Sequence, residues 1–445
     1  MIKHLLFIAA MMAASFATAR NLPLPQFGSA EHKSAGDDIK LQFASDISGT
    51  EKIKLALPNG LILTYGEIVT LAGDFYGDPE KPISLGKTEQ DRRQRFWRAY
   101  STLAIDPGAV TEAPKILAVV QDEELQLQDG MKKGESPDAV YDRIATENDV
   151  AWNCITGGLC AEDYPGISKE LLHKIYYLKQ GRYLKLEDKN FDHFGQEAWL
   201  AYSVGHKIAV DMAISAGRTL DKKKLAESYA VNAFANHYLS DGFSTGHLRT
   251  PHLSLYNHVS PATVGSLLAS YMHYEDNEYG LTISNRYGET WKAYGDAYYF
   301  DPRNKKNRDI LLKVMQASAD EIFAAYNYGL APTDDKVAAL VPDLKKANTL
   351  DPSHNNIAPL FYWDEKKQAL LRRVDISNPY DYEWTENWTG WGTLTELMNA
   401  KGSLRSLQGE LLSHPDTQIP AILAGLINDS ELLRWFQSFQ TTDHA

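Results

Sequence analysis

The chain has 445 residues, of which 44% are hydrophobic and 23% charged, a composition that excludes intrinsic disorder and permits a large buried core. The formal net charge is −13, which disfavours a long nucleic acid as a partner because phosphate backbones bind mainly through Lys and Arg. With only 2 cysteines, a disulfide-framework fold and a cysteine-rich zinc module are excluded. Any metal site must therefore use nitrogen and oxygen ligands.

Residues 1–19 have the pattern of a secretory signal peptide. Lys3 and His4 precede the apolar run 5–14, and Ala17-Thr18-Ala19 is a small-x-small cleavage site. The run is too short to span a bilayer, and no later stretch is long and apolar enough to do so. We therefore expect a mature protein without a transmembrane anchor, secreted or periplasmic.

Both cysteines lie in one short segment. Cys154 and Cys160 are separated by Ile-Thr-Gly-Gly-Leu, and an exported protein meets an oxidising compartment. We therefore expect a structural disulfide that closes this loop.

Hydrophobic periodicity predicts a mainly α fold. Asn59-Gly60 first indicates a turn between two short apolar runs, 53–57 and 61–63. Helical spacing follows over 65–75, 90–104, 112–127, a helix opened by Ser136-Pro137, 169–178, 196–216, 225–241, 260–273 and 309–328. We expect one helical domain over residues 20–345, with a large insertion at about 80–190.

The character of the chain changes in residues 346–445. The apolar runs 360–363 and 370–376 flank a charged turn and predict a β-hairpin. Three tryptophans follow, and then two helical patterns at 404–412 and 419–439. We interpret this part as a mixed C-terminal extension or small domain.

The segment 236–251 carries the pattern most informative about chemistry. An apolar stripe on the preceding helix continues through His237 and Asp241, which places two ionisable residues on a face that should be buried. At i and i+4 their Cβ atoms lie about 5–6 Å apart, so both can reach one ion. Gly246 permits a turn that returns His247, and this His/Asp set suits zinc. The alternative is a buried His–Asp pair with His247 at the surface.

Four further residues could join this motif, and each has an ordinary alternative. His193 precedes a long helix and could simply cap against a neighbouring acid, whereas His273 ends a helix and could interact with its dipole. His32 lies in an irregular stretch and could be an exposed loop residue. Asp74 follows a helix within turn-forming sequence.

In this order, the pieces resemble the superfamily of zinc-dependent phospholipases C and single-strand-specific zinc nucleases. The sequences His237-Tyr-Leu-Ser-Asp241 and His247-Leu-Arg-Thr-Pro251 are most similar to those of secreted bacterial phosphatidylcholine-cleaving phospholipases C. The segments 65–77, 190–194 and 272–277 also resemble that branch. The resemblance covers about 27–330 and implies a helical body that holds three zinc ions.

The resemblance also implies the ligands. The first zinc would take His193, His237 and Asp241, with Asp241 bridging to another ion. The second would take His247, His273 and a carboxylate that we place at Asp276, with Glu275 and Asn277 as alternatives because the family's carboxylate usually falls where Asn277 stands. The third would take His32, Asp241 and the backbone of Phe27. Asp74 matches the family's acidic residue that binds zinc or acts as the base for water.

One departure concerns Phe27. The family usually has Trp at this position and uses it as a freed N-terminus, but signal cleavage leaves residues 20–26 ahead of it. Either a second trimming removes them, or Phe27 binds through its carbonyl alone, or the third site is weakened.

The function implied is hydrolysis of phosphatidylcholine-type lipids, at a membrane or micelle surface, to diacylglycerol and phosphocholine by zinc-activated water. Phe75, Tyr76 and Phe191 could hold choline by cation–π attraction or be core aromatics, and Arg249 could meet phosphate or form a structural ion pair. A zinc nuclease or nucleotidase is one alternative. Another is a zinc-stabilised, non-catalytic secreted binding protein that works through its tryptophans (Trp384, Trp388 and Trp391), which could instead simply pack the extension onto the body.

Overall fold

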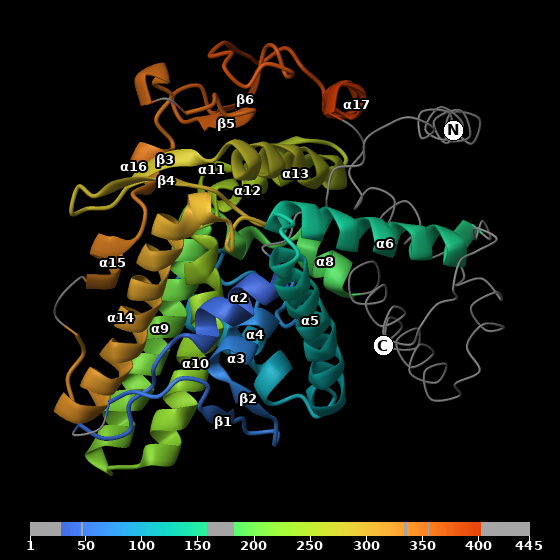
Figure 1. The fold of residues 1–445 in the computed structure, drawn as a ribbon. Coiled ribbons are helices and arrows are strands. Elements are labelled where there is room, and N and C mark those ends of the chain that lie inside the picture. The colour runs from blue at the N-terminus through green and yellow to red at the C-terminus, as the bar shows by residue number, and fades with distance from the viewer. Residues whose placement is uncertain (1–27, 46–47, 158–181, 333–335, 355, 402–445) are drawn as a thin grey trace.

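A computed structural model describes residues 28–45, 48–157, 182–332, 336–354 and 356–401, without the side chains of 148–157 and 182–184. The prediction of a mainly α fold is confirmed (Figure 1). The helices are α2 (Ser29–Asp37), α3 (Tyr65–Leu71), α4 (Glu89–Ala104), α5 (Ala109–Lys132), α6 (Pro137–Gly157), α8 (Arg182–Asp188), η1 (Phe191–His193), α9 (Gly195–Arg218), α10 (Lys222–Asp241), α11 (Thr245–Arg249), α12 (His252–His258), α13 (Ala262–Tyr279), η2 (Pro302–Asn304), α14 (Lys305–Tyr328), α15 (Lys336–Leu340), α16 (Leu344–Ala347), η3 (Pro352–His354) and α17 (Gly390–Lys401). The strands are β1 (Lys54–Ala56), β2 (Ile62–Thr64), β3 (Leu281–Ser284), β4 (Thr290–Ala293), β5 (Phe361–Asp364), β6 (Ala369–Arg373) and β7 (Trp384–Thr385).

Three long helices, α9, α10 and α14, pack against one another on the left-hand side of Figure 1. Every residue of α10 from Ser228 to Asp241 is buried, so this part of the helix is enclosed on all sides. Phe96 of α4 packs edge-on against Phe234 of α10, with ring centroids 5.6 Å apart. The segment expected as an insertion therefore contributes to the main core.

The N-terminal elements lie against α10. The turn at Asn59-Gly60 joins β1 and β2 as an antiparallel hairpin, with Leu55 opposite Leu63. Thr64 then caps α3 by accepting the backbone N–H of Glu67, whose carboxylate accepts the N–H of Thr64 in return. Both α2 and α3 contact α10, which brings the start of the chain to this helix.

The helix expected over 65–75 is shorter in the structure. Ala72 is extended and Gly73 has φ +71, so α3 ends at Leu71 and a tight turn follows. The hairpin β3–β4, which was not anticipated, pairs Leu281 with Ala293. A loop leads from it to α14.

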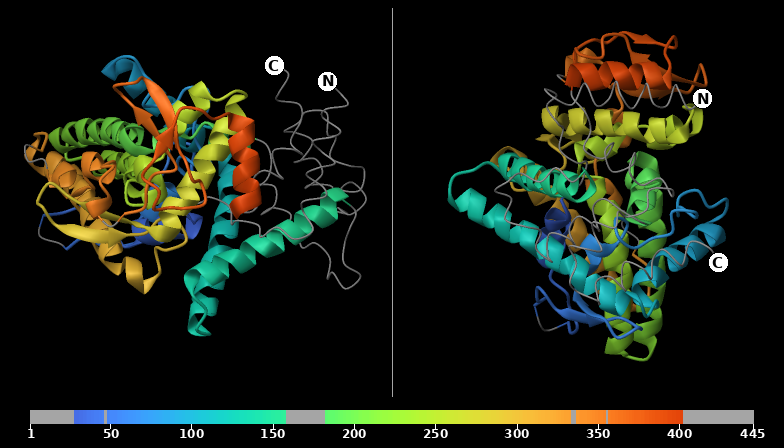
Figure 2. Two further views of the ribbon diagram at one scale, coloured as in Figure 1. Left: turned by 90° about the horizontal axis from the view of Figure 1, so that it is seen from above. Right: turned by 90° about the vertical axis from the view of Figure 1, so that its right-hand side faces the viewer.

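The extension begins with an antiparallel sheet in the order β5-β6-β7. The sheet and α17 share a second apolar cluster with α12 and α13, and they cover that side of the body (Figure 2). The indole N–H of Trp384 donates to the Pro359 carbonyl and that of Trp388 to the Leu370 carbonyl, whereas Trp391 is 49% exposed. Trp384 and Trp388 therefore serve packing.

Several expectations lie outside the described residues. These are the signal peptide 1–19, Phe27, the helices at 169–178, 404–412 and 419–439, and the Cys154–Cys160 disulfide, whose side chains are not described. Within the described ranges, none of the helices combines the length and apolar composition that a membrane span requires.

Candidate metal centre

Histidine and aspartate side chains from distant parts of the chain meet at the C-terminal end of α10. Four overlapping groups place their ligand atoms within 4.8 Å of one another. The groups are His32 with His237 and Asp241; Asp74 with His193 and His237; His193 with Asp241 and His247; and His247 with His273 and Asp296. Because they share members, they form one continuous cluster that could hold metal ions.

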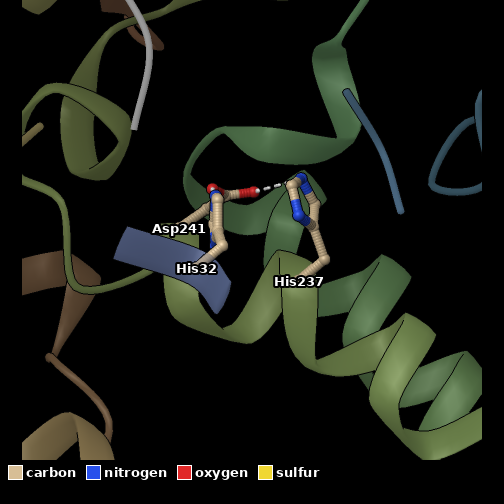
Figure 3. A group of neighbouring side chains, drawn as sticks. All are labelled: His32, His237 and Asp241. Carbon is tan, nitrogen blue, oxygen red and sulfur yellow. Dashed lines mark ion pairs between the residues drawn. The ribbon is translucent and has the colours of Figure 1, made fainter. Parts of the chain in front are cut away.

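The first group joins α2 to α10 (Figure 3). Asp241 presents Oδ1 at 3.5 Å from Nε2 of His32 and Oδ2 at 3.6 Å from Nε2 of His237. The two rings lie 4.3 Å apart, and all three residues are fully buried. His237 and Asp241, the i, i+4 pair of the sequence motif, thus lie on a buried face. His32 is buried within α2, which rules out its alternative interpretation as an exposed loop residue.

The second group forms around the turn after α3. Asp74 Oδ1 lies 3.8 Å from both His193 Nδ1 and His237 Nε2. Gly73 makes this approach possible, because a Cβ there would stand 2.4 Å from the His237 ring and 2.8 Å from His193. The Asp74 side chain is 31% exposed, whereas those of His193 and His237 are 4% and 0% exposed. Asp74 is thus the member of this group that faces solvent.

The far end of the cluster contains His247, His273 and Asp296. Asp296 Oδ2 lies 2.8 Å from His273 Nε2 and 3.5 Å from His247 Nε2. The short helix α11 carries His247, whose ring stacks on Phe194 at 4.8 Å and 6°. Asp241 Oδ2, 3.0 Å from His193 Nδ1, connects this end with the other groups through the His193–Asp241–His247 set.

In three of the histidine rings, Nδ1 forms a hydrogen bond on the side that faces away from the cluster. His237 Nδ1 lies 2.9 Å from the Val69 carbonyl, His247 Nδ1 2.9 Å from the His193 carbonyl, and His32 Nδ1 2.8 Å from the Ser240 hydroxyl oxygen. Carbonyls accept only, and the Ser240 hydroxyl donates to backbone carbonyls, so each ring donates through Nδ1. Each Nε2 then faces the cluster, and in the neutral ring it carries the lone pair that a metal ion binds.

The spacing of the inner atoms suits a divalent ion. Ligands of a tetrahedral zinc lie about 3.3–3.4 Å apart, given bond lengths of about 2.0–2.1 Å. His193 Nδ1 and His237 Nε2 are 3.3 Å apart, and several His–Asp pairs lie between 3.5 and 3.6 Å. Both oxygens of Asp241 and Oδ1 of Asp296 are buried and make no hydrogen bond to the described residues. Buried carboxylate oxygens facing imidazole lone pairs fit a cation better than they fit one another.

The local electrostatics separates the pKa values of neighbouring groups. Burial lowers the pKa of His32 to about 4, although Asp241 opposes that shift. At His247 the nearby carboxylates of Asp296 and Asp241 outweigh burial and raise the pKa to about 9. Burial raises the pKa of Asp74 to about 7, against the effect of His193. Asp241 is also desolvated, but the surrounding histidines lower its pKa well below the ordinary value.

The carboxylate expected at Asp276 lies elsewhere. Arg249 binds both of its oxygens, with Nη2 2.6 Å from Oδ1 and Nε 2.8 Å from Oδ2, in a buried pair. Asp276 is thus turned away from the histidines, and the structural interpretation of Arg249 fits better than phosphate binding. The alternative Glu275 pairs with Arg373.

The remaining alternative, Asn277, lies beside the cluster and supports it. Its Nδ2 donates to Asp296 Oδ2 at 3.0 Å, and its Oδ1 accepts the backbone N–H of Gly246 at 2.6 Å. Gly246 is needed for this contact, because a Cβ there would stand 2.5 Å from Asn277 Oδ1 and from the His273 ring. Gly246 therefore permits the close packing of α11 against α13.

Asp296 was not predicted from its local sequence, and it takes the place in the cluster that was expected for Asp276. It lies in the loop after β4, where no helical pattern or family motif marks it. A clue was the sequence Tyr294-Gly-Asp296-Ala, an acid beside a glycine, but such pairs are common in turns.

The aromatic residues proposed to hold choline are in the core. Phe75 is 4% exposed and Tyr76 1%, and the Tyr76 hydroxyl donates to Glu112. Phe191 is buried against His252 and Tyr256. Their alternative interpretation as core aromatics therefore fits.

The structure brings together His32, Asp74, His193, His237, Asp241, His247 and His273, as the sequence led us to expect, and adds Asp296. Comparison of the chain with protein-family models, with curated proteins and with solved structures found no match.

Proposed function

We propose that the chain is a secreted, zinc-dependent phosphodiester hydrolase of the phospholipase C type, which cleaves phosphatidylcholine-type lipids into diacylglycerol and phosphocholine. The observation that carries the hydrolase proposal is the continuous His/Asp cluster with one solvent-facing carboxylate, Asp74. The lipid class comes from the likeness of the 237–251 segment to phospholipases C.

Zinc suits the donor set. Imidazole nitrogens with carboxylate oxygens and no thiolate are ligands that Zn²⁺ accepts, although other divalent metals accept them too. The carboxylates of Asp74, Asp241 and Asp296 would leave two or three divalent ions with excess positive charge, and a phosphate group would be attracted to it. Bound zinc would supply Lewis-acid stabilisation of phosphoryl oxygens and acidify a water molecule.

Asp74 has the properties of a general base. Its side chain is 31% exposed, and its Oδ1 lies 3.8 Å from both His193 Nδ1 and His237 Nε2. An ionised carboxylate in this position could accept a proton from an attacking water molecule. Asp241, fully buried with a lowered pKa, instead stays ionised and holds charge in place.

An assay of released phosphocholine against released nucleotide, with and without a chelator, tests the proposal. We expect chelator-sensitive phosphocholine release. Asp74→Asn should keep most of the metal and lose turnover, whereas His237→Ala should lose metal and stability. Nucleotide release would instead support the nuclease alternative, and zinc without either activity would support the binding protein.

A further inference from the structure

Glu31 lies beside the metal centre, next to His32 in the first turn of α2, and is fully buried. A buried carboxylate is costly unless hydrogen bonds satisfy its oxygens. Those bonds come from two places. Oε2 accepts the backbone N–H of Gly28 at 3.3 Å, which completes the cap of α2. The others come from the loop that carries Asp296.

In that loop the backbone N–H groups on the far side of Asp296 donate to Glu31. Ala297 N–H reaches Oε2 at 3.3 Å and Tyr299 N–H reaches Oε1 at 3.0 Å. On the near side, Gly295 N–H donates to the Asn277 carbonyl at 3.4 Å. The backbone around Asp296 is thereby fixed to α2 on one side and to α13 on the other.

Ala297 has φ +70, a left-handed conformation that is unfavourable for a residue with a Cβ. Such strain persists only where the surroundings over-determine the backbone, and it is concentrated at functional sites. Here the N–H of the strained residue is one of the three backbone N–H groups that Glu31 accepts.

We propose that Glu31 is a positioning residue, which fixes the loop carrying Asp296 against the helix carrying His32 and so sets the spacing between the two ends of the metal cluster. The inference rests on the proposed metal centre. Glu31 acts through the backbone and binds neither metal nor substrate. Its loss should therefore affect chiefly the site that contains Asp296.

The test measures zinc affinity by competition with a chelator and the absorption spectrum of the Co²⁺-substituted protein. We expect Glu31→Gln to weaken one class of site about 10–100-fold, as the loss of a supporting hydrogen bond does. In an Asp296→Asn background the same substitution should cause no further loss. Glu123→Gln is the matched control, because the Glu123 carboxylate is also buried and accepts the Ala30 N–H of the same helix turn at 3.1 Å.

Glu31→Asp provides a second variant that keeps the carboxyl group at the helix start but shortens the side chain. We expect it to fold and to show an intermediate loss of affinity. Equal zinc affinities for Glu31→Gln and Glu123→Gln would overturn the inference, as would fully additive losses in the double variant. A wild-type protein that binds no zinc would overturn the metal centre itself, so the two failures are distinguishable.

Discussion

The roles of Asp276 and Asp296 give the sharpest test of the site. Both are buried aspartates, but one is paired with an arginine and the other with two histidines. We expect Asp276→Asn to lower the free energy of unfolding by about 3–5 kcal/mol, because it leaves Arg249 as a buried charge without its partner. Zinc content after dialysis should remain that of the wild type.

Asp296→Asn should behave in the opposite way. Loss of a hydrogen-bonded supporter of a ligand costs about 10–100-fold in affinity, so loss of a ligand itself should cost at least about 100-fold. Zinc content measured by atomic absorption and urea unfolding in the presence of a chelator separate the two effects. The reasoning is refuted if Asp276→Asn loses zinc while keeping its unfolding free energy in chelator, or if Asp296→Asn keeps full zinc occupancy.

Three further predictions concern pH and the buried polar contacts. Zinc competes with protons for the His247 ring, whose pKa is raised to about 9. The zinc affinity should therefore fall about tenfold for each pH unit below that value, or about 100-fold from pH 8 to pH 6. A chelator-competition titration that gives the same zinc affinity over this range contradicts the prediction. Arg373→Met should lose about 1.5–3 kcal/mol in urea unfolding, because Glu275 loses its bidentate partner and keeps Lys401. Arg373→Met with Glu275→Met should recover much of this loss, and a double variant no better than the single variant is the contrary result. Ser318→Ala removes the hydroxyl oxygen that accepts hydrogen bonds from Tyr202, Asn232 and Asn236, so it should lower the free energy of unfolding by about 1–3 kcal/mol in the same assay. Ser228→Ala is the control and should cost less, because the Ser228 hydroxyl donates to the Lys224 carbonyl. Equal losses in the two variants would contradict the role of the Ser318 hydrogen bonds.

The sequence was most informative where local pattern and function coincide. His237 and Asp241 continue an apolar stripe, so a helix implied both that they are buried and that they share a face. The structure places them so, with Asp241 between His32 and His237. Long periodic segments such as 196–216 and 309–328 are likewise found as α9 and α14.

Tertiary packing decided what the sequence could not show. The short helix α2, with the polar sequence Ser-Ala-Glu-His-Lys-Ser-Ala-Gly-Asp, has no apolar stripe, yet it is buried because Gly36 lets its backbone approach Gly66 of α3. The place of Asp296 in the cluster could not be predicted from the sequence for a related reason. Its place depends on the hydrogen bonds of a loop to Glu31 and Asn277, and neither partner is near it in the chain.

The position of Asp276 shows how one residue along a helix changes the chemistry. Asn277 is one turn after His273, so its side chain lies on the same helix face. Asp276, one residue earlier, is rotated toward Arg249. An amide at position 277 cannot replace a charged ligand, but it can donate to one, and it donates to Asp296.

The electrostatics of the cluster argues for function rather than stability. Burial lowers the pKa of His32 to about 4, while Asp296 and Asp241 overcome burial and raise that of His247 to about 9. Both imidazoles lie beside the same buried carboxylate, Asp241, which stabilises the protonated form of each ring. Apolar side chains of similar size would fill this space without such opposition, and buried ionic groups can often be replaced in that way at no loss of stability. Strongly shifted pKa values in a buried cluster are common at functional sites. A divalent cation is the ligand that would satisfy the imidazoles and the carboxylates together.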